Sequence, residues 1–312
     1  MAVPDFVIAG QPKSGTTALS TFLNEHPGVF MARPKEPHYF CHDFHEEAAR
    51  FHGSNLSRYF QYTDLNSYLR LFSPASDHCL RGEASTNYLY SRVAAAELRK
   101  VNAALRIVVI LREPISFLLA LHAQYRNETT ETAETLLKAL EIEPARKRGE
   151  ALPRRVRCPS YLFYRDRIRY VRQLQRYLEH FPVRQLKVVI FDDFAADNEA
   201  TFADVVEFLG ADPGFRPRFR RIHGRQQARS ALLNRWLRHP VLTSLTRGLV
   251  STAAYDRLQR GVEQMLFRAA PSGATPMKAE ELTRLKAQLR PEVEALSEFL
   301  KRDLVHEWGY RQ

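Results

Sequence analysis

A short apolar run, Phe6–Ala9, leads directly into a loop that lies between two glycines, Gly10 and Gly15. Four consecutive apolar residues are typical of a strand buried on both faces of a sheet. From Thr16 onward the apolar side chains recur at helical spacing. A strand, a glycine-bounded loop and a helix in this order present backbone N–H groups and a helix N-terminus to a phosphate. Because the loop also carries the cation Lys13 and several hydroxyl groups, we expect it to bind a dianionic phosphate.

The loop differs from a Walker A motif in the position of its lysine. The pattern GxxxxGK[ST], laid on Gly10, matches Gly15 and Thr17 but requires lysine where Thr16 stands, and the loop lysine is instead Lys13. A nucleoside-triphosphate kinase needs its lysine over the β- and γ-phosphates and a hydroxyl group on Mg²⁺. A lysine inside the loop is better placed to contact the bridging oxygen of a 5′-phosphate.

The sequence PKSGTT at residues 12–17, after its apolar strand, resembles the 5′-phosphosulfate loop of sulfotransferases that use 3′-phosphoadenosine 5′-phosphosulfate (PAPS). The resemblance implies that Lys13 neutralises charge on the bridging oxygen as adenosine 3′,5′-bisphosphate leaves, without a metal ion. It also implies a set of residues that bind the phosphosulfate: Lys13, Ser14, Gly15, Thr16 and Thr17.

A second motif begins where the clearest strand of the sequence, Arg106–Leu111, ends at Arg112. Ligands of α/β sheets bind at the carboxyl ends of such strands, although an ion pair between Arg112 and Glu113 is an alternative. The LREP sequence, with proline suited to the first turn of a helix, resembles the 3′-phosphate motif of sulfotransferases. The resemblance implies that Arg112 binds the 3′-phosphate. The serine that follows the arginine by eight residues in that motif is Ala120 here, and Ser116 is the nearest hydroxyl.

A third motif, KEPHYF at residues 35–40, carries Glu36 and His38. A carboxylate or an imidazole within hydrogen-bond range can take the proton of an acceptor hydroxyl. The motif resembles the segment that carries the catalytic carboxylate in carbohydrate-type sulfotransferases and many bacterial relatives. The resemblance implies that Glu36 is the base and that His38 orients it or the acceptor. We expect an extended segment, in which both side chains point the same way. A solvated Glu36 paired with Lys35, or His38 as the base, remain alternatives.

Two further segments resemble parts of the same family. Residues 81–90, which we expect to be rich in turns, resemble a segment that lines the acceptor cleft. Within it, Glu83 is expected either to support Lys13 or His38, or to form an ordinary buried ion pair.

The basic loop at residues 223–230 resembles the loop that folds over the adenosine and the 3′-phosphate. Arg225 and Arg229 are equal candidates for that contact, and a generic basic surface turn is the alternative.

Strands that alternate with helices predict an α/β fold with a P-loop-like parallel central sheet flanked by helices, and residues 1–312 as a single domain. The basic, proline-containing stretch 141–160 predicts a surface loop. Toward the C-terminus we expect helices with breaks near Pro240, Pro271 and Pro291. Nothing in the resemblance covers three segments, in which we expect acceptor specificity to lie: 41–80, 127–160 and 235–285.

The formal net charge of +11, from 46 Lys and Arg against 35 Asp and Glu, attracts anions. No signature of an RNA- or DNA-binding module accompanies the charge, so we do not expect nucleic acid as a partner. No run approaches the ~20 apolar residues that span a bilayer. The first strand begins at Phe6, and the cysteines are odd in number and lack metal-binding spacing, so we expect a cytoplasmic protein.

The sequence therefore predicts an enzyme that moves the sulfuryl group of PAPS to a hydroxyl of a carbohydrate, a lipid or a natural product. For the oligomeric state, a homodimer is an alternative that the sequence leaves open. Two alternatives remain. A P-loop nucleoside or sugar kinase would need Mg²⁺ and a lysine at position 16, and a non-catalytic nucleotide- or glycan-binding protein would need neither.

Overall fold

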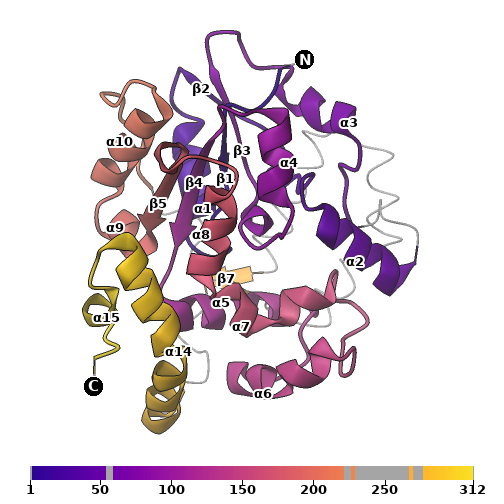
Figure 1. Cartoon of the computed structure of the whole chain (residues 1–312). Helices are drawn as coiled ribbons and strands as arrows, with labels where there is room; N and C mark the ends of the chain where they lie inside the picture. The colour runs from indigo at the N-terminus through magenta and orange to yellow at the C-terminus, as the bar shows by residue number, and fades with distance from the viewer. Residues whose placement is uncertain (1, 54–58, 221–225, 229–266, 270–276, 312) are drawn as a thin grey trace.

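The structure, a computed structural model, describes residues 2–53, 59–220, 226–228, 267–269 and 277–311. A parallel sheet with the strand order β2-β3-β1-β4-β5 lies at its centre, with helices on both faces (Figure 1). The predicted α/β fold is confirmed. The strands of this sheet are β1 (Phe6–Ile8), β2 (Val29–Met31), β3 (Leu80–Ala84), β4 (Arg106–Leu111) and β5 (Leu186–Ile190). A separate antiparallel pair consists of β6 (Gln226–Ala228) and β7 (Phe267–Ala269).

The two faces of the sheet bury alternate residues of each strand, as the two-residue period of a strand requires. Phe6 and Ile8 of β1 belong to the smaller core, whereas Val7 belongs to the larger one. The smaller core is closed by α1 (Thr16–Leu23), α9 (Phe191–Ala196) and α10 (Asn198–Leu209). The larger core includes residues of α2 (His42–His52), α3 (Leu65–Leu69), α4 (Ala94–Val101), α5 (Pro114–Asn127), α6 (Leu136–Lys147), α7 (Tyr164–Arg167), α8 (Tyr170–Leu178), α14 (Ala279–Leu300) and α15 (Leu304–Glu307). The 3₁₀ turns are η2 (Arg70–Phe72), η3 (Thr86–Tyr88), η4 (Pro159–Leu162) and η5 (Val183–Gln185).

Strand β3 occupies a place in the middle of the sheet that the sequence did not predict. We expected residues 81–90 to be rich in turns, but Leu80–Ala84 pairs with β2 on one side and β1 on the other. Gly82 is required there because a Cβ atom would lie 2.1 Å from the ring of Phe6. A polar strand with a glycine lacks the apolar run by which a buried strand is recognised.

The loop after β1 lies at a switch point of the sheet. Strand β1 is flanked by β3 and β4: the chain runs from β1 to β2 on the β3 side, and later from β3 across to β4 on the other side. Ligands of open α/β sheets bind at such points, beyond the carboxyl ends of the strands. Gly10 lets the loop pass close to β4, since a Cβ atom would lie 2.6 Å from the backbone nitrogen of Ile110.

Two prolines that were expected in a loop or at a break lie inside helices. Pro144 lies in α6, which extends to Lys147, so the prediction of a surface loop over 141–160 is wrong for its first part. Pro144 has no N–H for the carbonyl four residues earlier, Leu140, and that oxygen instead accepts a hydrogen bond from Arg165 Nη1 at 2.5 Å. The break predicted near Pro291 is also wrong, because α14 continues through it. The breaks predicted near Pro240 and Pro271 lie outside the described residues.

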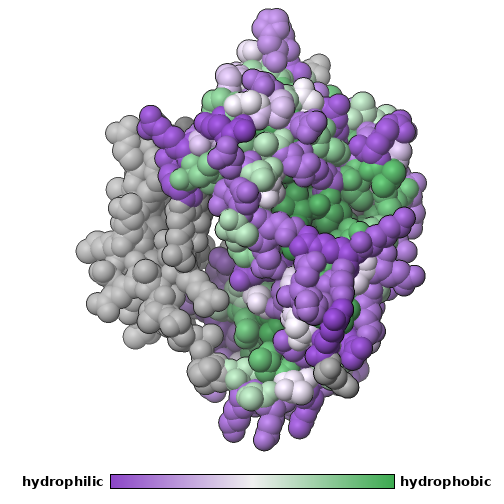
Figure 2. Space-filling view, turned by 90° about the vertical axis from the view of Figure 1, so that its left-hand side faces the viewer, coloured by the Kyte–Doolittle hydropathy of each residue, from purple (hydrophilic) through white to green (hydrophobic). Residues whose placement is uncertain are grey.

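The molecular face in Figure 2 is mainly hydrophilic and is interrupted by apolar patches. Among the described residues, none of the helices has the length and apolar character needed to cross a bilayer.

Candidate active site

A cavity of about 1130 Å³ is lined by the loop after β1 and by segments that are distant in the sequence. Its walls come from residues 12, 13 and 15–18, the turn at Glu36 and His38, η3, α5, residues 155–157 and α9 with the start of α10. The cavity therefore brings together the predicted phosphate loop, the predicted base and the predicted 3′-phosphate residue.

Helix α1 directs its unpaired N-terminus at this cavity. Its N-cap, Gly15, has φ of 85°, offers no side-chain cap, and is followed by no acidic residue in the first turn. Thr16, Thr17 and Ala18 of that turn line the cavity. The first N–H groups of a helix have no partner within it, so they are available to an anion here. Lys13, with φ of 62°, lies in the same wall.

Lys13 and Ser14 occupy different environments in the loop. Burial lowers the pKa of Lys13 below its ordinary value, and the nearby Glu128 carboxylate partly offsets this effect. Ser14 is fully buried, its hydroxyl donates to the carbonyl oxygen of Pro12 at 3.4 Å, and it does not line the cavity. Any contact of Ser14 with a phosphate would therefore use its backbone.

Arg112 enters the cavity beside the phosphate loop. Its Nη1 donates to the carbonyl oxygen of Lys13 at 2.9 Å, and its guanidinium lies 4.7 Å from the centre of the Phe191 ring. Glu113 instead caps α5, where its carboxylate accepts from the backbone N–H of Ile115 and Ser116. Pro114 occupies the first helical turn, as predicted.

Ala120, which stands where the 3′-phosphate motif has a serine, lines the cavity, whereas Ser116 does not. One turn further along α5, Gln124 lines the cavity and donates from Nε2 to Glu128 Oε1 at 2.9 Å. After Ala120, the amide of Gln124 is the first polar group of α5 in the cavity wall that could take the place of the serine.

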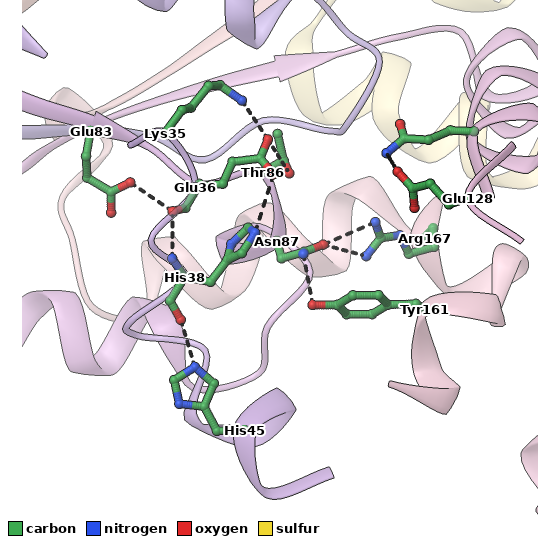
Figure 3. Close-up of polar contacts among 12 residues, drawn as sticks. Lys35, Glu36, His38, His45, Glu83, Thr86, Asn87, Glu128, Tyr161 and Arg167 are labelled. Atoms are coloured by element: carbon green, nitrogen blue, oxygen red, sulfur yellow. Dashed lines mark hydrogen bonds and ion pairs between the residues drawn. The ribbon is translucent and has the colours of Figure 1, made fainter. Parts of the chain in front are cut away.

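Glu36 and His38 meet at one end of the cavity, but not through an extended segment. Both residues have positive φ, 64° and 53°, so the predicted extended conformation is wrong. Their side chains nevertheless converge, with Nε2 of His38 3.4 Å from Oε2 of Glu36 (Figure 3). Contacts to the end of β3 hold this turn, because Glu36 N donates to Ala84 O at 2.9 Å and His38 N to Ser85 Oγ at 3.2 Å.

Charged neighbours keep Glu36 ionised, and burial keeps His38 neutral. The Glu36 side chain is 38% exposed, and its Oε1 lies 2.6 Å from Lys35 Nζ. Burial alone would raise the pKa of Glu36, but Lys35 and His38 outweigh it and hold the pKa well below its usual range. Burial lowers the pKa of His38, the Glu36 carboxylate opposes this, and the Arg157 guanidinium adds to it. Among the described residues, Nδ1 of His38 has no hydrogen-bond partner.

Glu83, in β3, supports the turn that carries Glu36 and His38. It is fully buried, and its carboxylate accepts from Ser85 Oγ at 2.8 Å and from Tyr68 OH at 3.3 Å. Burial raises the pKa of Glu83 to about 7, against the lowering effect of the hydroxyl groups. Since no described cation pairs with it, the expected alternative of an ordinary buried ion pair is wrong. Glu83 instead reaches the His38 backbone through Ser85.

A polar network that no sequence motif indicates lies between η3 and Tyr161, both of which line the cavity. Asn87 donates from Nδ2 to Tyr161 OH at 2.9 Å, and its Oδ1 accepts from both Nη atoms of Arg167 at 3.2 and 3.3 Å (Figure 3). Arg167 is fully buried and lies 4.4 Å from the centre of the Tyr90 ring. Asn87 falls in the segment that resembles an acceptor cleft, but Tyr161 and Arg167 carry no motif that would identify them.

Two predicted nucleotide residues, Arg225 and Arg229, lie outside the described residues. Phe219 and Arg220, shortly before them, line the cavity.

Comparisons with known proteins agree with this geometry. A model described as "Sulfotransferase family" matches residues 4–214, which contain every candidate residue in the described part of the chain. The human heparan sulfate glucosamine 3-O-sulfotransferase 3B1 is 22% identical over 223 residues, covering 67% of this chain and 46% of that protein. The human bifunctional heparan sulfate N-deacetylase/N-sulfotransferase 3 is 26% identical over 219 residues, covering 68% and 23%. The chain thus aligns with less than half the length of these relatives.

Among solved structures, a sulfotransferase from Alicyclobacillus acidocaldarius has the same fold. Its TM-score is 0.70 at 22% identity, and the alignment covers 99% of both chains. Because the family model matches about two thirds of the sequence, the chain belongs to the sulfotransferase family.

Proposed function

We propose that this protein transfers the sulfuryl group of PAPS to a hydroxyl group of an acceptor. One observation carries the proposal. The uncapped N-terminus of α1, Lys13 and Arg112 line the same cavity as the Glu36–His38 pair. An anion site and a base that share one cavity suit the transfer of an anionic group to a hydroxyl.

The residues around the loop fit the charges of this nucleotide. The N–H groups that open α1 and the Lys13 ammonium suit the 5′-phosphosulfate, and the Arg112 guanidinium suits the 3′-phosphate. Phe191 and Phe194 of α9 lie against Gly15 and offer aromatic surface for the adenine ring of the nucleotide. Lys13, Gly15, Thr16, Thr17 and Arg112 thus stay our proposed nucleotide residues, and Ser14 would contribute through its backbone.

The reaction needs one proton acceptor and one stabilised leaving group. The acceptor oxygen forms a bond to sulfur while the bond from sulfur to the bridging phosphate oxygen breaks, and adenosine 3′,5′-bisphosphate departs. Glu36 takes the hydroxyl proton, and Lys13 stabilises the negative charge that grows on the bridging oxygen. His38, neutral and hydrogen-bonded to Glu36, fixes the direction of the carboxylate.

The acceptor is a small-molecule or glycan hydroxyl in this proposal. The names of the two human relatives point to a glycan in those proteins. The cytoplasmic location, the homodimer, the single-domain organisation and the roles of 41–80, 127–160 and 235–285 stay predictions.

Calorimetry with two nucleotides tests the proposal. Adenosine 3′,5′-bisphosphate should bind without a metal ion and more tightly than ATP with Mg²⁺. A panel of hydroxyl acceptors with labelled PAPS should then yield a sulfated product. Tighter binding of ATP with Mg²⁺ would favour a kinase, and nucleotide binding without any transfer would favour a non-catalytic binding protein.

A further inference from the structure

Beyond the Glu36–His38 pair, the cavity has a wall that the nucleotide residues do not use. This wall consists of Tyr125, residues 155–157 and Tyr161. If the proposed function holds, the acceptor lies along this wall, because its hydroxyl must reach Glu36 while the phosphate loop and Arg112 are proposed for the nucleotide.

Arg157 is a cation of this wall without an acidic partner among the described residues. Its guanidinium lies 5.5 Å from the centre of the Phe60 ring, and no carboxylate of the described chain pairs with it. It is close enough to His38 to lower the pKa of that imidazole. The cation therefore stands next to the residues that would receive the acceptor hydroxyl.

Arg155, two residues earlier, also lines the cavity. Its Nη1 donates to Thr129 Oγ1 at 3.2 Å, and within the described chain it forms no ion pair. A neutral hydroxyl leaves the guanidinium charge uncompensated.

Three neighbouring cations of the same part of the chain are neutralised. Arg146 pairs with Glu131, while Lys147 and Arg165 both pair with Glu143. Glu128 also lines the cavity, but it accepts a hydrogen bond from Gln124, acts electrostatically on Lys13, and forms no ion pair with either arginine. Within the described chain, these cations outside the cavity have carboxylate partners and the two arginines inside it have none.

We propose that Arg157, assisted by Arg155, binds an oxyanion of the acceptor, so that the hydroxyl to be sulfated belongs to a molecule that already carries a carboxylate, sulfate ester or phosphate ester. A guanidinium presents parallel N–H groups that match two oxygens of such a group. In a partly buried cavity this pairing is stronger than at an exposed surface. The Tyr161 and Tyr125 rings provide apolar surface for the rest of the acceptor.

Binding of matched probes to the protein saturated with adenosine 3′,5′-bisphosphate tests this inference. The probes are methyl glucuronide, glucose 6-sulfate, glucose 6-phosphate and the neutral methyl glucoside, titrated by NMR. At least one anionic probe should bind about tenfold or more tightly than methyl glucoside, and the preferred one identifies the oxyanion. Arg157→Gln should remove most of that preference, and Arg155→Gln should reduce it.

Two variants serve as controls. Arg154→Gln changes an arginine that lines a separate small hollow outside the cavity, and it should keep the full preference. Arg157→Lys keeps the charge but loses the paired N–H groups, so it should keep part of the preference and the effect on His38.

Two outcomes would overturn the inference alone. One is equal affinity for charged and neutral probes in the wild-type protein, and the other is a preference that survives the Arg155→Gln, Arg157→Gln double variant. In both cases adenosine 3′,5′-bisphosphate still binds, so the proposed function stands. Failure of the wild-type protein to bind that nucleotide would overturn both proposals.

Discussion

The Nη1 atom of Arg112 donates a hydrogen bond to the backbone carbonyl oxygen of Lys13 at 2.9 Å, across 99 positions of the sequence. The two residues follow β4 and β1, which are neighbours in the sheet. The two nucleotide motifs are therefore one structural unit, and the side chain proposed for the 3′-phosphate also holds the loop proposed for the 5′-phosphosulfate.

This double role shapes the prediction for Arg112→Ala. Binding of AMP should weaken because the loop loses a hydrogen bond, but binding of adenosine 3′,5′-bisphosphate should weaken more. The additional loss should be ~1.5–3 kcal/mol, typical of a hydrogen bond to a charged group. Calorimetry with both nucleotides measures the difference. Equal losses would mean that Arg112 only supports the loop.

Lys13→Ala should reduce the transfer rate by a factor of about 10²–10³, as expected when a group that stabilises developing charge is removed. The backbone carbonyl that Arg112 contacts is unchanged by this substitution. The melting temperature should therefore stay close to that of the wild type. Labelled PAPS gives the rate, and a folded Lys13→Ala protein with wild-type turnover would refute the role of the lysine.

The parts of the fold that could be predicted are those with a local signal. The apolar runs at Phe6 and Arg106–Leu111 identify strands without any tertiary information. Strand β3 could not be identified in this way, because Gly82 is explained only by the ring of Phe6 from a neighbouring strand. The side-chain neighbours of Glu36 were predicted correctly from a wrong backbone, since positive φ at two non-glycine residues leaves no mark in the sequence.

The acceptor wall could not be predicted from the sequence either. Arg146 and Arg157 look alike in a basic stretch, yet one is fully buried with a carboxylate and the other faces the cavity. Only tertiary packing distinguishes them, because their partners come from other parts of the chain.

The buried pair of Arg146 and Glu131 should be costly to break. Both side chains are fully buried, and two N–H···O contacts of 2.6 and 2.7 Å join them. Arg146→Met leaves the carboxylate buried with Tyr164 OH as its remaining side-chain donor, so unfolding in urea should show a loss of about 3–5 kcal/mol. The double variant with Glu131→Gln should recover part of this loss. A loss below about 1 kcal/mol would show that the pair is dispensable.

Glu83→Gln should change the pH dependence of stability. The pKa of Glu83 is raised to about 7 in the folded state, above the value of 4.5 for a free side chain. Stability from the protonated form is therefore present in full below pH 4.5 and is lost as the pH rises through 7. The amide of the substituted side chain does not titrate, so the variant should gain stability relative to wild type as the pH rises from about 5 to about 8, by about 1.4 kcal/mol for each unit of pKa shift. Melting curves at both pH values measure this, and a difference that does not depend on pH would contradict it.

The assignment of the base rests on two variants. Glu36→Gln should nearly abolish transfer and leave the affinity for adenosine 3′,5′-bisphosphate intact, because Glu36 lies outside the loop that binds phosphate. His38→Asn should keep measurable activity, since an amide can still donate a hydrogen bond to the Glu36 carboxylate.

The pH dependence of the transfer rate identifies the base only when it is measured in the wild type and in both variants. The pKa of Glu36 is held well below its usual range, so a carboxylate base stays ionised down to acidic pH. Burial lowers the pKa of His38 below its ordinary value of about 6.5. If the imidazole were the base, activity would therefore fall at a pH below about 6.5. We expect the wild-type acid limb to persist in His38→Asn. Loss of that limb in His38→Asn, together with substantial activity in Glu36→Gln, would make His38 the base.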